Sequence, residues 1–340
     1  MEDKIILLSP EKHYYKVNLH THSVLSDGKL TPEEVKSEYK ARGYSAVALT
    51  DHSLMSVQQH LNDEDFIFLT GVEVNIPNAE NKGKTYHLNL ISKDPQLLWV
   101  PVHDPDMLEH MPAHFEKCKC DEMPLDYTVE NVNSVIKRAN EMGCLVIYNH
   151  PEWSLQFHEE YAGLEGLWGM EYRNSSCAYG YGLDTANEQV FREMLQKNNR
   201  LVPVMADDMH KIVNPRGYET LGKSWTMVAA DELSYDAIMD GLERRELYSS
   251  CGPEIHSIVL DGTNLTITCS PAASIQCVAQ HRRGSKICFA EDGKTLTEAT
   301  FDLSVWARRF GEAPDRMLRV IVTAPDGTYA VSCAYTADDL

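Results

Sequence analysis

Imidazole and carboxylate side chains recur in this sequence where apolar, strand-like runs end. The clearest instance is His20-Thr21-His22, at the end of the run that begins at Val17. Alternate residues of a strand point to the same face, so both imidazoles can reach a single metal ion. Further imidazoles and carboxylates follow, most of them near the ends of later runs: Asp27, Asp51, His52, Glu73, His87, His150, Asp208 and His210.

These side chains are predicted to meet at one place in the fold. In a barrel of parallel strands, the carboxyl ends of the strands open on a single mouth. Any one of them alone is an ordinary polar residue, but their recurrence favours a metal site. Neutral imidazole and carboxylate suit zinc, manganese or iron, and the absence of a cysteine cluster argues against a purely structural zinc site. The other histidines lack this placement, and we interpret them as structural or surface residues: His13, His60, His103, His110, His114, His158, His256 and His281.

Strand-like and helix-like segments alternate between Lys16 and about Ser250, which is typical of an α/β fold with largely parallel strands. The first helix is predicted to begin at Pro32, with Thr31 as its cap, and to stop at Gly43. Strands are expected at residues 17–20, 46–50, 66–72, 86–91, 144–149, 167–172, 201–206 and 225–228, and helices at 129–142, 186–198 and from 235.

After Cys251-Gly252-Pro253 the sequence changes to short β-type runs separated by Asp-Gly turns. We therefore predict two domains, residues 1–250 and a small all-β, sandwich-like domain of residues 251–340. Residues 92–126 are expected to form a long loop, and loops of that length are usually functional or mobile. The strands expected in the second domain are 255–260, 265–269, 274–279, 318–323 and 329–333.

The stretches HTHSVLSDGKLTPEE, GYSAVALTDH, GVEV, NHP and DDMH together resemble the polymerase and histidinol phosphatase (PHP) superfamily of metal-dependent phosphoesterases. The resemblance covers residues 16 to about 250, and the combination of H-x-H-x-x-x-x-D-G with A-L-T-D-H is highly specific. It implies a distorted (β/α)7 barrel of the PHP type with two or three divalent ions. The strands after residue 250 resemble, more weakly, the β-sandwich-like extension of some members.

By position, the resemblance assigns the candidate ligands to three ions. It gives the first ion His20, His22, Glu73 and Asp208, the second ion Glu73, His87 and His150, and the third ion Asp27, His52 and His210. A shared Glu73 would bridge two ions about 3.5–4 Å apart, the arrangement that clamps the attacking and leaving oxygens in phosphoryl transfer. Asp207 stands where the family often has serine, and this extra carboxylate could compete with Asp208.

The activity implied by the resemblance is hydrolysis of a small phosphomonoester by a metal-activated hydroxide at a di- or trinuclear site. Glu73 and Asp208 are the expected catalytic ligands, and Asp51 is expected to assist catalysis by orienting a neighbouring ligand. Glu171 either lines the mouth or is structural. Four cationic side chains near strand ends are expected to bind the phosphate: Arg173, Lys211, Arg216 and Lys223.

Other functions remain open at this point. One is a phosphodiesterase or nuclease acting on short nucleotides or nucleotide bisphosphates, and another is a non-catalytic metal-binding module that has kept the fold. Amide or ring hydrolysis ranks lower, because barrels with that chemistry lack the additional TDH and D-x-H residues.

The segment GYETLGKS, residues 217–224, matches the G-x-x-x-x-G-K-[ST] pattern of phosphate loops. Such a loop needs a buried strand before its first glycine and a helix at its Lys-Ser pair. Residues 211–216 are polar and contain Pro215, and residues 225–228 are predicted to form a strand. We therefore interpret the match as coincidental.

The net charge of −20 argues against long nucleic acids and membranes as partners. The expected partner is a small phosphorylated substrate, whose charge bound ions would offset. The N-terminal residues resemble neither a signal peptide nor a membrane anchor, so the cytoplasm is the expected location. Nine cysteines in no disulfide-like pattern are interpreted as reduced. The oligomeric state does not follow from the sequence.

Overall fold

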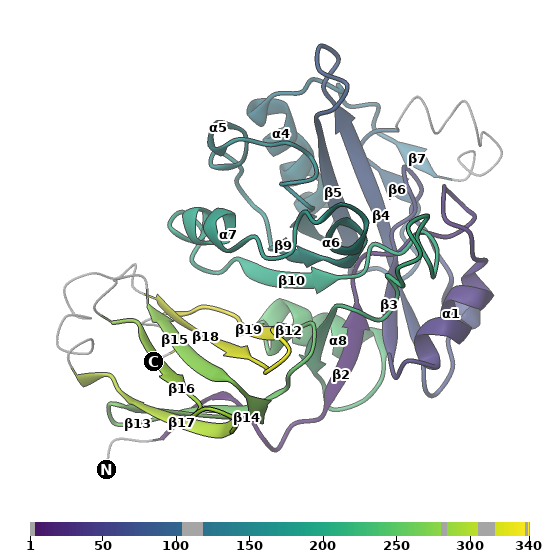
Figure 1. The fold of residues 1–340 in the computed structure, drawn as a ribbon. Coiled ribbons are helices and arrows are strands. Elements are labelled where there is room, and N and C mark those ends of the chain that lie inside the picture. The colour runs from purple at the N-terminus through teal and green to yellow at the C-terminus, as the bar shows by residue number, and fades with distance from the viewer. Residues whose placement is uncertain (1–3, 104–117, 280–283, 305–316, 337–338, 340) are drawn as a thin grey trace.

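One long sheet runs through most of the chain in the computed structural model, which describes residues 4–103, 118–279, 284–304, 317–336 and 339 (Figure 1). The strand order is β10-β9-β8-β5-β4-β3-β2-β11-β12-β19-β18-β15-β16, and β20 pairs with β18. The first seven strands carry the candidate site: β10 (Val202–Ala206), β9 (Gly169–Asn174), β8 (Cys144–Tyr148), β5 (Thr85–Ser92), β4 (Ile67–Pro77), β3 (Ala46–Leu49) and β2 (Tyr14–Asn18). The others are β11 (Trp225–Ala229), β12 (Leu247–Ser250), β19 (Tyr329–Ser332), β18 (Met317–Thr323), β15 (Ser274–Ala279), β16 (Lys286–Phe289) and β20 (Tyr335–Thr336).

A second sheet lies against the C-terminal strands of the first, as the lower left of Figure 1 shows. Its order is β1 (Ile5–Leu8), β13 (Ile255–Asp261), β14 (Asn264–Ala272) and β17 (Leu296–Asp302). The two sheets bury a common apolar core that includes Ile267 and Val320. The predicted change to β structure after residue 250 is confirmed. Because β1 pairs with β13, and β12 with β19, segments on both sides of residue 250 share sheets, and the domain boundary there stays a prediction.

The helices begin where the sequence supplies capping residues. The Thr31 hydroxyl accepts a hydrogen bond from the Glu34 amide, and the Glu34 carboxylate accepts one from the Thr31 amide, so both ends of this capping box are made. Ser234 caps the last helix, which begins at the predicted residue 235. The bounds are α1 (Pro32–Lys40), η1 (Gln59–Leu61), α4 (Val129–Glu141), α5 (His158–Tyr161), α6 (Ser175–Tyr181), α7 (Glu188–Leu195) and α8 (Tyr235–Arg244).

The expectation of largely parallel strands fails at β5, which runs antiparallel to both of its neighbours, β4 and β8. The reason is the short connection between β4 and β5, residues 78–84, in which the Asn78 carboxamide accepts hydrogen bonds from the amides of Glu80 and Asn81. Parallel strands need a crossover of a dozen or more residues, whereas a connection this short makes a hairpin. The start of β5, rather than its end, therefore lies beside the end of β4.

The two outer strands of this seven-strand group approach each other through the residues that follow them. The His22 amide donates to the Met209 carbonyl at 3.0 Å, and the Asp208 amide donates to the His20 carbonyl at 2.9 Å. Within the described residues no ladder closes the sheet completely, so the fold is a mixed α/β structure with a large sheet, and the (β/α)7 barrel stays a prediction.

Three elements near the site were not expected from the sequence. The short helix α6 follows β9 directly, capped by the Asn174 carboxamide, and its residues SSCAYGY include few strong helix formers. Within the predicted long loop, β6 (Trp99–Val100) pairs with β7 (Lys119–Cys120), while residues 104–117 of that loop lie outside the described residues.

None of the described helices is both long and apolar enough to cross a membrane.

Candidate metal centre

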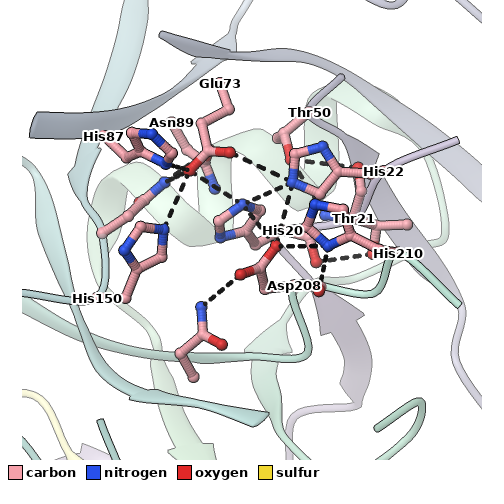
Figure 2. Close-up of polar contacts among 12 residues, drawn as sticks. His20, Thr21, His22, Thr50, Glu73, His87, Asn89, His150, Asp208 and His210 are labelled. Carbon is pink, nitrogen blue, oxygen red and sulfur yellow. Dashed lines mark hydrogen bonds and ion pairs between the residues drawn. The ribbon is translucent and has the colours of Figure 1, made fainter. Parts of the chain in front are cut away.

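Glu73 lies at the centre of a buried cluster of imidazoles, between the ends of several strands (Figure 2). Its two carboxylate oxygens face different sets of ring nitrogens. Glu73 Oε1 lies 3.0–3.3 Å from nitrogens of His20, His87 and His150. Glu73 Oε2 lies 3.3 Å from nitrogens of His22 and His52. A carboxylate whose oxygens point to separate donor sets has the arrangement of a bridging ligand.

Asp208 closes the other side of the cluster. Its Oδ1 lies 3.2 Å from His20 Nε2 and 3.1 Å from His22 Nε2, and its Oδ2 accepts a hydrogen bond from the Asn174 carboxamide. The backbone of Asp208 is left-handed, with φ of 52°, and that of His150 has φ of 22°. Non-glycine residues adopt such φ values only where surrounding contacts hold them, and they are concentrated at functional sites.

Asp27 and His210 form the more exposed edge of the cluster. Their side chains are 43% and 30% exposed, and His210 Nε2 lies 3.3 Å from Asp27 Oδ2. Asp27 comes from a tight loop after β2 that folds back on His22, and a Cβ on the next residue, Gly28, would lie 2.6 Å from the His22 carbonyl carbon. A glycine is therefore required beside Asp27 for this loop to close.

All nine residues predicted as metal ligands are thus brought together. They form four overlapping groups, in each of which one ligand atom per residue lies within 4.8 Å of the others. The groups are His22, Asp27, His52 and His210; His20, His22 and Glu73; His20, His150 and Asp208; and Glu73, His87 and His150. His87 reaches the cluster from near the start of β5, because that strand runs opposite to its neighbours.

Three buried atoms of the cluster make no well-aligned hydrogen bond with a described residue: His22 Nδ1, His52 Nδ1 and Asp208 Oδ1. His52 Nδ1 and Asp208 Oδ1 have the ion-pair contacts given above. Leaving such atoms unsatisfied costs about 1–3 kcal/mol each. In addition, His20 Nε2 and His22 Nε2 lie only 3.1 Å apart. Four-coordinate zinc with bonds of about 2.0 Å separates its ligand atoms by about 3.3 Å, which is close to the spacings here. The donor set and its geometry therefore fit divalent ions.

The three remaining carboxylates beside the cluster hold its ligands in place from outside. Glu171 Oε1 lies 2.7 Å from His20 Nδ1, and its Oε2 accepts from the His150 amide. This fixes the His20 ring with Nε2 toward the cluster, as carboxylate partners of metal-binding histidines do. Glu171 is fully buried and does not line the cavity, so of the two roles left open by the sequence the positioning one agrees with its contacts.

Asp51 also lies beside the cluster, and its expected role of orienting a neighbouring ligand stays a prediction. Its carboxylate accepts hydrogen bonds from the Ser23 amide and from the hydroxyls of Ser23, Ser26 and Ser56. The contacts with Ser23 and Ser26 anchor the loop that follows His22 and carries Asp27, and the contact with Ser56 anchors the segment after His52. These contacts agree with an orienting role that acts through the backbone.

Asp207 does not compete with Asp208. Its buried carboxylate turns the other way and accepts hydrogen bonds from three consecutive amides, those of Gly222, Lys223 and Ser224, at 2.6–2.9 Å. These amides belong to the segment that matches the phosphate-loop pattern, so their bound anion is a carboxylate of the chain itself. Burial raises the pKa of Asp207 to about 6, although the three amides oppose this rise.

The cluster forms the floor of a cavity of about 640 Å³. Of the four predicted phosphate-binding cations, Lys211 and Arg216 line this cavity, whereas Arg173 and Lys223 do not. Arg173 instead donates to the Thr185 carbonyl, and Lys223 pairs with Glu219 at 3.2 Å. Lys29 also lines the cavity and was not predicted, because its position depends on the fold of the loop after β2.

Contacts within the cluster raise the pKa of some of its members and lower that of others. Burial alone would lower the pKa of His22 and of His150, but their contacts with Asp208, Glu73 and Glu171 raise these pKa values to about 10 and about 9. Burial alone would raise the pKa of Glu73, yet the surrounding imidazoles, His87 first, hold it well below its usual range. Burial lowers the pKa of His52 to about 3. In the absence of ions, protons on some imidazoles thus balance the carboxylates.

Comparison with known proteins gives a family match and several structural neighbours for this chain. The model of the PHP domain family matches residues 18–251. A solved two-domain protein from Bacteroides vulgatus, containing a predicted PHP-like metal-dependent phosphoesterase, is 16% identical with a TM-score of 0.46, over 99% of this chain and 98% of that chain. A protein from Bifidobacterium adolescentis, proposed to be a metal-dependent phosphoesterase, is 15% identical with a TM-score of 0.38, over 62% of this chain and 92% of that one.

An amidohydrolase from Chromobacterium violaceum, solved with bound sulfate and no metal, is 16% identical with a TM-score of 0.36, over 68% of this chain and 96% of that one. No curated protein sequence matches the chain. With TM-scores below 0.5, the structural likenesses add nothing to the family match.

We predict that binding of a divalent ion to the metal-free protein releases protons. The neighbouring carboxylates raise the pKa of His22 and of His150, which favours protonated rings, and an imidazole must lose its proton to bind an ion. Apparent affinity should therefore rise between pH 6 and 8, by about tenfold per pH unit for each proton displaced. Calorimetric titrations in buffers of different ionisation enthalpy measure both quantities. An affinity that stays constant over this range would contradict the prediction, and His256→Gln, outside the cluster, should behave like the wild type.

We also predict that Glu171→Gln lowers the affinity for divalent ions by about 10- to 100-fold, because the charged partner of His20 Nδ1 is lost while the side chain keeps its volume. Competition with a chromophoric chelator measures this affinity. Glu165→Gln, an exposed position, serves as the matched control. Unchanged affinity in Glu171→Gln would show that the contact does not tune the cluster.

Proposed function

The chain belongs to the PHP domain family, and on this basis we propose that it is a metal-dependent phosphoesterase that hydrolyses a small phosphomonoester. The observation that supports this most strongly is the arrangement around Glu73, whose two oxygens face separate sets of imidazoles. Such a shared carboxylate is typical of sites that hold two ions for phosphoryl transfer.

In this proposal the ligands divide among two or three ions of zinc, manganese or iron. His20, His22, Glu73 and Asp208 hold the first ion; Glu73, His87 and His150 hold the second; and Asp27, His52 and His210 hold the third. Two of the groups within 4.8 Å support this division, because one matches the second set and another contains the third set together with His22. The first set is divided between the other two groups, one of which joins Asp208 and His20 to His150. Bound divalent ions would supply Lewis-acid stabilisation of phosphate charge and would lower the pKa of a water molecule.

The residues of the chain bind and orient the phosphate. Lys29, Lys211 and Arg216 line the cavity, and none of their side chains makes an ion pair with another described residue. In a chain of net charge −20, unpaired cations gathered in one cavity favour an anionic ligand there. Arg216 can offer a planar pair of donors to phosphate oxygens, and the lysines offer point charges.

The finer architecture is also a proposal. We infer a distorted (β/α)7 barrel up to about residue 250, followed by a β-sandwich-like domain. The hydrogen bonds between residues 20–22 and 208–209 support the barrel, since they join the outer strands at the mouth. The partner is proposed to be a small phosphorylated molecule rather than a long nucleic acid or a membrane, in keeping with the acidic net charge.

We predict that removal of divalent ions abolishes hydrolysis of p-nitrophenyl phosphate and that manganese or zinc restores it. Loss of the ions should cost roughly 1,000-fold in kcat/KM, because they supply several kcal/mol of charge stabilisation. Steady-state kinetics with chelated and reconstituted protein provide the measurement, together with His22→Ala, which should remain inactive, and His256→Ala, which should not.

Undiminished turnover by protein shown to contain no metal would contradict the proposal. Faster hydrolysis of bis(p-nitrophenyl) phosphate than of the monoester would favour a phosphodiesterase instead. Metal binding without turnover of any phosphate ester would favour a non-catalytic module.

A further inference from the structure

The cavity above the ligand cluster is much larger than a phosphate group, so its walls must contact the organic part of the substrate. One wall is α6, which contributes Ser176, Cys177, Gly180 and Tyr181. The facing wall is a small hairpin, residues 211–220, in which the Thr220 amide donates to the Ile212 carbonyl. The Asn214 carboxamide at the turn donates to the Tyr179 carbonyl at 3.2 Å, which joins the hairpin to α6.

The lining offers two large aromatic rings, together with the small aliphatic ring of Pro215. Among the described residues that line the cavity there is no leucine, isoleucine, valine or methionine, and the large apolar side chains are Trp153 and Tyr181. Trp153 packs against the cluster, with its ring centre 5.0 Å from that of His150 and 5.7 Å from that of His87. An alkyl chain would find only a small matching surface at Pro215, whereas a planar ring could lie on a larger aromatic face.

Tyr181 is the ring available for such contact. It lines the cavity and is 62% exposed. The guanidinium carbon of Arg216 lies 5.2 Å from its ring centre. This cation–π contact holds Tyr181 beside a cationic group that can bind an anionic oxygen, while most of the ring stays open.

We propose that the organic part of the substrate carries a planar aromatic ring that stacks on Tyr181, next to Arg216. The inference rests on the proposed phosphomonoesterase function and names its substrate class: phosphate esters of alcohols that bear an aromatic ring. Offset or edge-to-face contact between two rings is favourable beyond the burial of area alone, by a factor of roughly 3- to 10-fold in affinity. A stacking contact that is equally strong in the bound substrate and in the transition state lowers KM and leaves kcat unchanged.

Benzyl phosphate and cyclohexylmethyl phosphate test the proposal with the metal-loaded full-length protein. Both are esters of primary alcohols of similar size, and they differ in whether the ring is aromatic and flat. The wild type should favour the benzyl ester by roughly 3- to 10-fold in kcat/KM, through KM. Tyr181→Leu should bring the ratio close to one with turnover of the cyclohexylmethyl ester retained, and Tyr181→Phe should keep the wild-type ratio.

Tyr218→Leu is the matched control, because Tyr218 is 55% exposed on the facing hairpin but does not line the cavity. Its ratio should equal that of the wild type. Equal turnover of the two esters by the wild type, or a preference that survives in Tyr181→Leu, would overturn the aromatic proposal and leave the phosphoesterase function standing. Failure to hydrolyse any phosphate ester would overturn both.

Discussion

The contact on which the site depends is that of the buried Glu73 carboxylate with five imidazoles. Six histidines and three carboxylates in one buried cluster would repel and leave polar atoms unsatisfied unless a cation or protons joined them. Glu73 is central because each of its carboxylate oxygens faces a different set of imidazole nitrogens. The Asn149 carboxamide also holds the Glu73 side chain in place with a hydrogen bond of 2.7 Å to Oε1. The strand ends that supply the imidazoles are arranged around this one group.

A second layer of carboxylates holds the first layer in position, and each member does so in a different way. Glu171 contacts the His20 ring directly, Asp51 gathers the serine hydroxyls of the loop before Asp27, and Asp207 ties the segment after β10 to three amides. These differences cannot be seen in the sequence, because each of the three carboxylates looks there like another potential metal ligand. Only the direction of each side chain separates a ligand from a group that positions one.

The candidate ligands could be predicted from the sequence because they follow recognisable strands and belong to short, specific motifs. The direction of β5 could not, since residues 86–91 look the same in either orientation, and only the short turn before them signals a hairpin. The cationic residues that face the cavity were harder still to predict from the sequence. Arg173 and Lys211 both follow strand ends, yet Arg173 turns to the Thr185 carbonyl while Lys211 faces the cavity, a difference set by contacts distant in sequence. Lys29 was not predicted because its position depends on how the loop after β2 closes. Helix α6 was not predicted because its sequence contains few strong helix formers.

The central claim is that this cluster is a multinuclear metal centre rather than a polar core. Anomalous X-ray diffraction from crystals of manganese-loaded protein tests it most directly, because it locates the ions and counts them without assuming any activity. The account predicts two or three anomalous peaks enclosed by the nine residues, with Glu73 between two of them. Absence of such peaks within the cluster, or a single peak that Glu73 does not contact, would contradict it.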